Sequence, residues 1–491
     1  MKAYSPKKCS SHQKKSPEHT KLSQKIANFC INFLPKSVLK SCQLMYRKSA
    51  KVCIKKLTYS VFIVKINLMA YNNRLADSIL KEMLEAKGAV LVEGAKWCGK
   101  TTTAEQLANS RLYMQDPAKK EQNLQLANLN PSLLLEGKTP RLIDEWQLAP
   151  KLWDAVRFEI DRRNEFNQFI LTGSAVPASF DEISHSGTGR ISRLLMRPMT
   201  LLETGDSTGK VSLKKLFQNE TDIAATSESN LRKIAYLICR GGWPKILGVS
   251  EKIALRQAID YYDAVVNSDI SRVDNKTRNP ERVKRLMHSY SRNIGSQIKY
   301  EELRKDIIGN DIESFSIETL YDYISALKKI FVIEDSPAWN PNLRSKTAVR
   351  TTDTRYFVDP SIATACLGIG PEDLINDLNT MGFLFENLCI RDLRVYAQTL
   401  DGLVYHYRDK NNIECDAVVH LRNGSYGLIE IKLGGDKLIQ EGAKTLTTLE
   451  KNIDTSKMKS PSFKMILTAV GDYAYKREDG ILIVPVTCLG N

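Results

Sequence analysis

Short apolar runs alternate with longer, more polar segments along residues 86–205 of this chain. The runs lie within 89–93, 141–145 and 168–174 and are rich in Val, Ile and Leu. Runs of this length that are bounded by polar residues or glycine are typical of strands buried on both faces of a parallel sheet. The pattern therefore predicts an α/β domain in which helices separate parallel strands.

A glycine-bounded loop follows the first apolar run, and a helix is expected after it over residues 102–110. The loop reads Gly94-Ala95-Lys96-Trp97-Cys98-Gly99-Lys100-Thr101. In this G-x-x-x-x-G-K-T pattern, glycines allow backbone amides to turn inward onto phosphates, and the following helix adds its positive end. Lys100 would reach the β- and γ-phosphates, the Thr101 hydroxyl would hold Mg²⁺, and amides up to Thr102 would complete the cradle. The sequence thus predicts a P-loop that binds ATP and Mg²⁺.

Polar residues stand at the ends of the next two apolar runs. Asp144 would hold Mg²⁺ through water, and Glu145, the next residue, would polarise the water that attacks the γ-phosphate. Thr172 and Ser174 end the third run. They are candidates for sensing the γ-phosphate, and capping of the following turn is the alternative.

Arginines follow a glycine-rich stretch at residues 187–190. Arg190 lies directly after the glycines, and Arg193 and Arg197 follow it. One of them, with Arg190 favoured, would act as an arginine finger, supplied in cis or by a neighbouring subunit. The alternative is that they are ordinary exposed arginines.

The hydrophobic period becomes helical between residues 281 and 339. Helices are expected over about 281–294 and 300–308, and a third from Ser316 carries Leu320, Ile324, Leu327 and Phe331 on one face. A strand is expected over 331–334. This order is typical of a winged helix, which either contacts DNA phosphates, here through Lys328, Lys329, Arg344 and Lys346, or serves as a protein contact.

The C-terminal part predicts a second α/β domain. Strands are expected over 413–419 and 426–432 and a helix over 382–396, and strand alternation places Glu430 and Lys432 on one face. With Asp416 and Glu386 nearby, this set resembles the PD-(D/E)xK nuclease fold. The resemblance implies that Asp416, Glu430 and Glu386 hold Mg²⁺ and that Lys432 stabilises the attacking hydroxide or the phosphorane charge. Cys415 stands where restriction enzymes have proline, so both active cleavage and an inactive scaffold remain open.

The net charge of +15 is concentrated at the front of the 491-residue chain. Residues 1–70 hold fourteen Lys and Arg47 against the single acid Glu18, a net of +14, and the other 421 residues hold 56 bases and 55 acids. This basic leader is a nucleic-acid-binding tail, a targeting segment, or an upstream extension of a protein that starts at Met69. No function is built on it.

Cysteine spacing and hydropathy favour a soluble cytoplasmic protein. The ten cysteines include no C-x-x-C pair, which argues against a structural zinc site and for a reducing compartment. The most apolar run of the leader, 60–70, is interrupted by Lys65 and Asn67, so no membrane-spanning helix is expected.

From about Tyr71 to the end, the chain resembles a family of bacterial and archaeal ATP-binding proteins with an AAA-type domain and a C-terminal domain of unknown function. Five phrases carry the resemblance together with the motifs above: 240–244 (RGGWP), 269–272 (DISR), 356–360 (YFVDP), 382–387 (GFLFEN) and 430–432 (EIK). The expected organisation is a P-loop ATPase core at 71–205, a helical lid at 206–280, a winged-helix-like part at 281–365 and a nuclease-like α/β domain at 380–491.

Two functions follow from this organisation. The first is an ATP hydrolase whose nucleotide state is coupled to a DNA-binding or nuclease-like C-terminal domain. The second is a nucleotide-switched signalling or scaffold protein whose C-terminal domain is inactive and binds a partner. Homo-oligomerisation is compatible with both.

Overall fold

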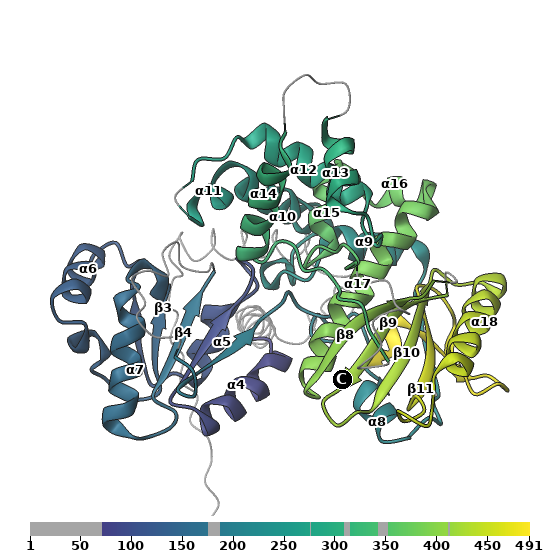
Figure 1. Ribbon diagram of the computed structural model, residues 1–491, viewed down its shortest axis with the longest axis horizontal. Helices are drawn as coiled ribbons and strands as arrows, with labels where there is room; N and C mark the ends of the chain where they lie inside the picture. The colour runs from purple at the N-terminus through teal and green to yellow at the C-terminus, as the bar shows by residue number, and fades with distance from the viewer. Residues whose placement is uncertain (1–70, 175–186, 275, 309–314, 342–351, 411–412) are drawn as a thin grey trace, which may run out of the picture. The chain divides into compact units, whose positions relative to one another are not determined.

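The computed structural model describes residues 71–174, 187–274, 276–308, 315–341, 352–410 and 413–491 (Figure 1). The chain divides into two units, residues 1–71 and residues 72–491. The leader and Met69 lie outside the described residues, as do Arg344 and Lys346. All elements below belong to the second unit.

Five parallel strands form the sheet of the N-terminal domain, in the order β2-β3-β4-β1-β5. Their bounds are β1 Ala89–Glu93, β2 Ser110–Tyr113, β3 Arg141–Asp144, β4 Phe169–Gly173 and β5 Ile191–Leu195. Successive side chains of β1 enter two different cores, Ala89 and Leu91 on one face and Val90 and Val92 on the other. This two-sided burial explains why the strands are apolar without interruption.

Helices cover both faces of this sheet (Figure 1). The elements are α4 Leu75–Ala86, α5 Lys100–Leu107, α6 Lys120–Leu129, η1 Pro131–Leu135, η2 Trp146–Leu148 and α7 Lys151–Arg163. Leu80 and Leu84 of α4 pack on one face, while Trp153 and Val156 of α7 pack on the other. Helix α5 ends at Leu107, earlier than expected, because strand β2 begins at Ser110.

A helical region follows. Its elements are α9 Leu231–Arg240, η3 Pro244–Ile246, α10 Glu251–Ala264, the π-helical turn η4 Val265–Asp269, α11 Ile270–Arg272, α12 Pro280–Arg292, α13 Tyr300–Ile308, α14 Ile317–Lys329, α15 Pro360–Leu367 and α16 Pro371–Asn376. Ser316 caps α14 by accepting a hydrogen bond from the amide of Thr319 at 3.1 Å, and Leu320, Ile324 and Leu327 are buried.

The strand expected over 331–334 does not form. Phe331 has a left-handed φ of 58°, which turns the chain out of α14. Only isolated bridges follow among the described residues of this region: Ile333 with Phe357 and Ser336 with Thr354, both antiparallel, and Ala338 with His406, parallel. The three helices lie where the sequence places them, except that α14 ends at Lys329, so Phe331 follows the helix instead of lying on its face. A winged helix stays a prediction.

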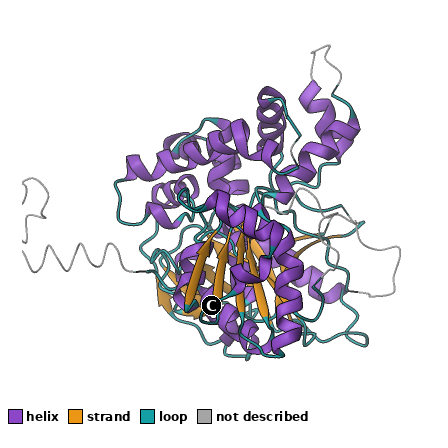
Figure 2. Ribbon diagram, turned by 90° about the vertical axis from the view of Figure 1, so that its left-hand side faces the viewer, coloured by secondary structure: helices purple, strands orange, loops and turns teal. Residues whose placement is uncertain are grey.

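The C-terminal domain is built on a seven-stranded mixed sheet in the order β7-β12-β13-β11-β10-β9-β8. The bounds are β7 Ala225–Thr226, β8 Gly402–Arg408, β9 Glu414–Leu421, β10 Tyr426–Lys432, β11 Phe463–Thr468, β12 Tyr473–Lys476 and β13 Leu482–Pro485. Helix α17 (Leu378–Gln398) packs on β8, β9 and β10, and α18 (Asp436–Asn452) covers the other face through a second core. Figure 2, in which the N-terminal domain faces the viewer, shows that domain's helices in front of strands.

Part of the expected lid belongs structurally to the C-terminal domain. Strand β6 (Val211–Ser212) pairs with β14 (Leu489–Gly490), and β7 pairs with β12. Helix α8 (Leu213–Phe217) follows β6, and the turn η5 (Val486–Cys488) precedes β14. The two-residue strands 211–212 and 225–226 are too short for a sequence pattern to detect. One buried apolar cluster contains Ala95 and residues from Leu201 to Leu489, so the helical region and the C-terminal sheet share a core.

No helix within the described parts of the chain is long and apolar enough to cross a membrane.

Candidate functional site

The P-loop joins the end of β1 to α5 and has the backbone that its glycines allow. Gly94 and Gly99 have φ values of 147° and 101°. A Cβ atom at Gly94 would lie 2.0 Å from the carbonyl oxygen of Met196, so only glycine fits there. The buried Lys100 ammonium donates to the carbonyls of Gly94 at 2.9 Å and Ala95 at 2.8 Å. The lysine therefore lies against the loop that would enclose the phosphates.

A hydrogen-bonded cluster lies at the carboxyl ends of neighbouring strands beside this loop. Asp144 is 1% exposed, and its Oδ1 accepts from Thr101 at 2.7 Å and from Thr172 at 2.6 Å. Its Oδ2 accepts from Gln115 at 3.1 Å. The strand register explains why Asp144 contacts Thr172, because these two residues are paired across β3 and β4. The structure thus brings together the three residues expected around Mg²⁺ and the γ-phosphate.

Sequence reasoning missed Gln115. It follows β2, whose last residue Tyr113 is paired with Asp144. A polar residue just beyond a strand of four residues is a weak indication of a functional site. The strand β2 was itself not predicted, because a helix was expected up to residue 110.

Glu145 follows Asp144 and adopts a left-handed backbone with φ 56°. Its carboxylate accepts a hydrogen bond from Gln147 and another, at 3.4 Å, from the hydroxyl of Ser174. The left-handed turn separates the directions of the two neighbouring acids. Asp144 faces the threonines of the P-loop and β4, whereas Glu145 lies on the Ser174 side.

A second cluster lies in the C-terminal domain. The Lys432 ammonium is 2.6 Å from Glu430 Oε2 and 3.1 Å from Asp416 Oδ2, and the amide of Ile431 donates to Asp416 at 2.7 Å. Burial, together with the charge of Asp416, raises the pKa of Glu430 to about 8. Burial alone would lower the pKa of Lys432, but the two carboxylates raise it. The sequence prediction that Glu430 and Lys432 share a strand face agrees with this geometry.

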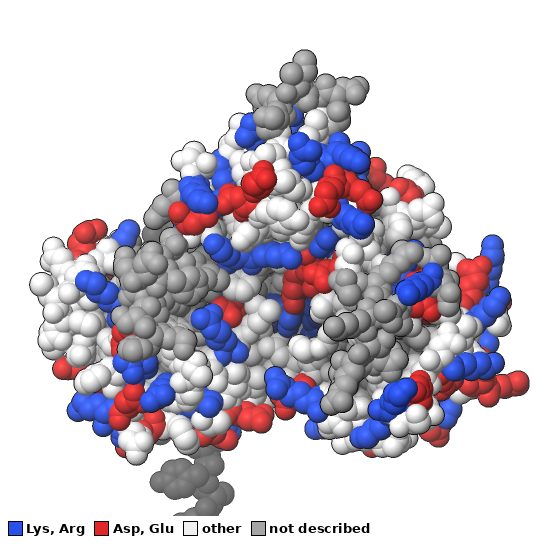
Figure 3. Space-filling model, in the orientation of Figure 1, with Lys and Arg blue, Asp and Glu red and all other residues white. Residues whose placement is uncertain are grey.

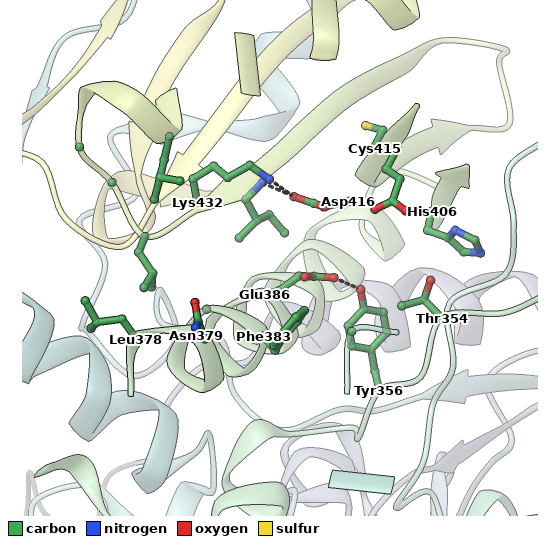
Figure 4. A pocket seen from close by; sticks show the side chains of 18 of the residues that line it. Thr354, Tyr356, Leu378, Asn379, Phe383, Glu386, His406, Cys415, Asp416 and Lys432 are labelled. Atoms are coloured by element: carbon green, nitrogen blue, oxygen red, sulfur yellow. Dashed lines mark hydrogen bonds and ion pairs between the residues drawn. The ribbon is translucent and has the colours of Figure 1, made fainter. Parts of the chain in front are cut away.

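Glu386 faces this cluster from helix α17 (Figure 4). Tyr356 donates a hydrogen bond to its carboxylate, and burial raises the pKa of Glu386 well above the usual range, with the charge of Asp416 adding to the effect. Glu386, Asp416 and Lys432 line a cavity of about 730 Å³. Phe383 of α17 lies at the same cavity and is 49% exposed.

The two sites differ in how well their residues fit a divalent cation. The Thr101 hydroxyl and the Asp144 carboxylate offer oxygen atoms beside the P-loop, which suits Mg²⁺ held by few protein ligands. In the C-terminal cluster the Lys432 ammonium already lies against both carboxylates. The described residues contain no group of three or more His, Cys, Asp or Glu side chains placed to hold a metal. The expected metal set of Glu386, Asp416 and Glu430 is therefore not assembled in this conformation.

Known protein families match three segments of the chain. Residues 86–205 match the AAA domain. Residues 231–373 match a domain of unknown function, DUF8612, and residues 381–489 match another, DUF4143. The N-terminal domain is therefore an AAA-type, ATPase-like domain with a P-loop NTPase fold, as the sequence predicted, and an α/β domain follows in the C-terminal region.

Similar whole proteins add little about activity. Uncharacterized proteins of Mycobacterium bovis and Mycobacterium tuberculosis are each 23% identical to this chain over 372 residues, 75% of this chain and of each relative. A Walker-type ATPase of Pyrococcus abyssi is 17% identical, with 60% of this chain and 96% of that chain covered and a TM-score of 0.38.

Arg190 lies at the wrong end of the AAA-type sheet to act on its own nucleotide site. It directly precedes β5, whose residues run in parallel with β1, whereas the P-loop follows the carboxyl end of β1. Its guanidinium pairs with Asp161 at 2.8 Å. The sequence did not reveal β5, so the error was undetectable there. Supply of Arg190 to a neighbouring subunit stays a prediction.

The other two arginines are also paired. Arg193 lies 3.1 Å from Glu93. Arg197, just beyond the carboxyl end of β5, donates to both carboxylate oxygens of Glu334, at 2.6 and 2.9 Å. Arg197 thus ties the end of the AAA-type domain to the segment that follows α14.

Arg74 supports the P-loop and gave no signal in the sequence. It is 7% exposed and donates to the carbonyls of Cys98 at 2.6 Å and Arg197 at 2.8 Å. It also pairs with Glu203 at 2.9 Å. A single arginine before a helix cannot be linked by pattern to a loop more than 20 residues away.

Of the lysines expected to contact DNA phosphates, Lys328 and Lys329 lie among the described residues, and they differ in whether an ion pair already holds them. Lys328 pairs with Asp335 at 2.7 Å, while Lys329 is exposed. On the face seen in Figure 3, basic and acidic side chains are interspersed without one extended basic surface. This distribution agrees with the nearly neutral charge of residues 71–491 and gives little support to DNA binding on that face.

Proposed function

We propose that this protein is an ATP hydrolase of the AAA type. The observation that carries the proposal is Asp144, whose carboxylate joins Thr101 of the P-loop to Thr172 of the neighbouring strand. Mg²⁺, when bound, would neutralise charge on the triphosphate. Thr101 and Asp144 would hold it, directly and through water.

The chain's own residues would do the remaining work. Lys100 would exchange the carbonyls of Gly94 and Ala95 for phosphate oxygens, because a charged acceptor binds an ammonium more strongly than a neutral one. Glu145 would accept the proton of the attacking water, and Gln147 and Ser174 would hold its carboxylate in place. Thr172 would orient Asp144.

The test compares nucleotide binding with turnover. Lys100→Ala should abolish hydrolysis and weaken ATP binding, whereas Glu145→Gln should bind Mg·ATP normally and hydrolyse it at least about 100-fold more slowly. Arg232→Gln, on an exposed side chain of α9, serves as a matched control with wild-type turnover. Equal turnover in Glu145→Gln and wild type would show that another group acts as the base.

For the C-terminal domain, one observation favours partner binding over nucleic-acid cleavage. The Lys432 ammonium is ion-paired with both Asp416 and Glu430, and a nuclease of this type needs those carboxylates for a cation. In this candidate function, nucleotide state would control access of a partner to the 730 Å³ cavity.

Plasmid nicking in the presence of Mg²⁺ or Mn²⁺ separates the two candidates for this domain. If the domain binds a partner, wild-type protein should nick the plasmid no more than the Lys432→Ala variant does. Nicking that disappears in Lys432→Ala while ATP binding persists would establish a nuclease instead.

A further inference from the structure

A second lysine of the P-loop is held by the helical region. The Lys96 ammonium lies 2.5 Å from Asp269 Oδ1, across 173 residues of sequence. The Lys96 side chain is 39% exposed, but the Asp269 side chain is only 7% exposed. A nearly buried carboxylate therefore depends on a partner that solvent, or a ligand, can reach.

Asp269 is placed by an irregular turn. It ends the π-helical turn η4, which lies between α10 and α11. Val265, Val266 and Ile270 on the same run are buried in the apolar core. A π turn adds a residue to the helical repeat and is frequent at functional sites. Here it directs Asp269 toward the P-loop while the neighbouring apolar residues stay in the core.

The next residue of the P-loop contacts the same helical run. Trp97 packs edge-on against Tyr261 of α10, with ring centroids 5.6 Å apart. Tyr261 is buried and stacks on Trp243 at 4.4 Å. Two successive loop residues, Lys96 and Trp97, thus contact one helical segment, residues 251–272.

We propose that Asp269 is a positioning residue that holds Lys96 away from the phosphates, and that nucleotide binding transfers Lys96 from Asp269 to the triphosphate. This inference rests on the proposed ATPase function and names its regulation. Lys96 belongs to the loop that wraps the phosphates, which carry more negative charge than one carboxylate. Its transfer leaves Asp269 nearly buried without a cation, which is costly. Segment 251–272 then loosens from the P-loop, so the helical region senses the nucleotide.

The test is a double-mutant cycle on the affinity for Mg·ADP, measured by titration calorimetry on the full chain at 0.15 M salt. Asp269→Asn removes the competitor for Lys96 and should tighten binding about three- to tenfold. In a Lys96→Met background the same change should tighten binding less than twofold. Asp269→Glu keeps the charge and should restore wild-type affinity. Asp263→Asn, on an exposed residue of α10, is the matched control.

Each other outcome overturns the inference. Equal gains with and without Lys96 would reveal general charge repulsion, and weaker binding in Asp269→Asn would mean that Asp269 prepares Lys96 for the phosphates. Amide exchange over 251–272 gives a second readout: Mg·ADP should raise it in wild type, and in Asp269→Asn it should already be raised without nucleotide. Wild type that fails to bind Mg·ADP would refute the proposed function itself, whereas binding without coupling refutes only this inference.

Discussion

The ion pair between Arg197 and Glu334 allows a quantitative test of how the AAA-type domain is joined to the rest of the protein. Glu334 receives both hydrogen bonds described above, and Arg394 Nε lies 3.7 Å from it. Burial raises the pKa of Glu334, but Arg197 and Arg394 outweigh it and lower the pKa to about 2. Glu334→Gln removes the charge and keeps the shape.

The magnitude follows from the pKa. A fall from 4.5 to about 2 corresponds to about 3 kcal/mol of stability, at 1.36 kcal/mol per unit. Because the folded pKa lies below the unfolded one, this stabilisation is complete above pH 4.5 and is lost as the pH falls toward 2. Glu334→Gln should therefore lower the free energy of unfolding by about 3 kcal/mol at pH 7 and by about 1.5 kcal/mol at pH 3.

Urea unfolding at pH 7 and pH 3, followed by tryptophan fluorescence and circular dichroism, measures both differences. The control is Glu372→Gln, whose pair with Arg232 has side chains 68% and 79% exposed. That change should cost less than about 1 kcal/mol at either pH. The reasoning is refuted if the two variants are equally stable at pH 7, or if the loss in Glu334→Gln is the same at both pH values.

Two further predictions concern the P-loop and its neighbouring strand, and a third concerns cysteines of the helical region. Gly94→Ala should abolish binding of Mg·ATP, because its Cβ would collide with a backbone carbonyl. Gly370→Ala, whose Cβ would meet only Asp373 Oδ2 at 3.8 Å, an ordinary contact, should bind normally, and binding by both variants would show that the loop can shift. Thr172→Val removes the hydrogen bond to the Asp144 carboxylate and should slow turnover about tenfold or more, with little change in nucleotide affinity. Unchanged turnover would mean that Thr172 only caps the following turn. Thiol titration at pH 8 should find slow reaction at Cys239 and Cys366, because burial raises their pKa values to about 12 and about 11. A rapid reaction at either cysteine, identified by mass spectrometry, would contradict that burial.

Local pattern predicted the P-loop and the neighbouring Asp144 and Thr172, but not Gln115 or Arg74. The P-loop needs eight consecutive residues, and Asp144 and Thr172 each stand at the end of an apolar strand. In a parallel sheet the carboxyl ends of neighbouring strands meet at one edge, so residues from separate strands could be placed together without coordinates. The same reasoning placed Lys432 beside Glu430, because alternate residues of one strand share a face.

Only the tertiary structure decided which charges pair across long distances. The sequence did not show that Arg190 precedes β5, because that strand is too polar to be recognised. Its place before the strand puts it at the edge of the sheet away from its own P-loop. The pairs Lys96 with Asp269 and Arg197 with Glu334 join segments more than 130 residues apart. Ion pairs of this kind depend on how whole elements pack against one another. Their charged residues therefore follow no regular spacing that could be recognised in the sequence.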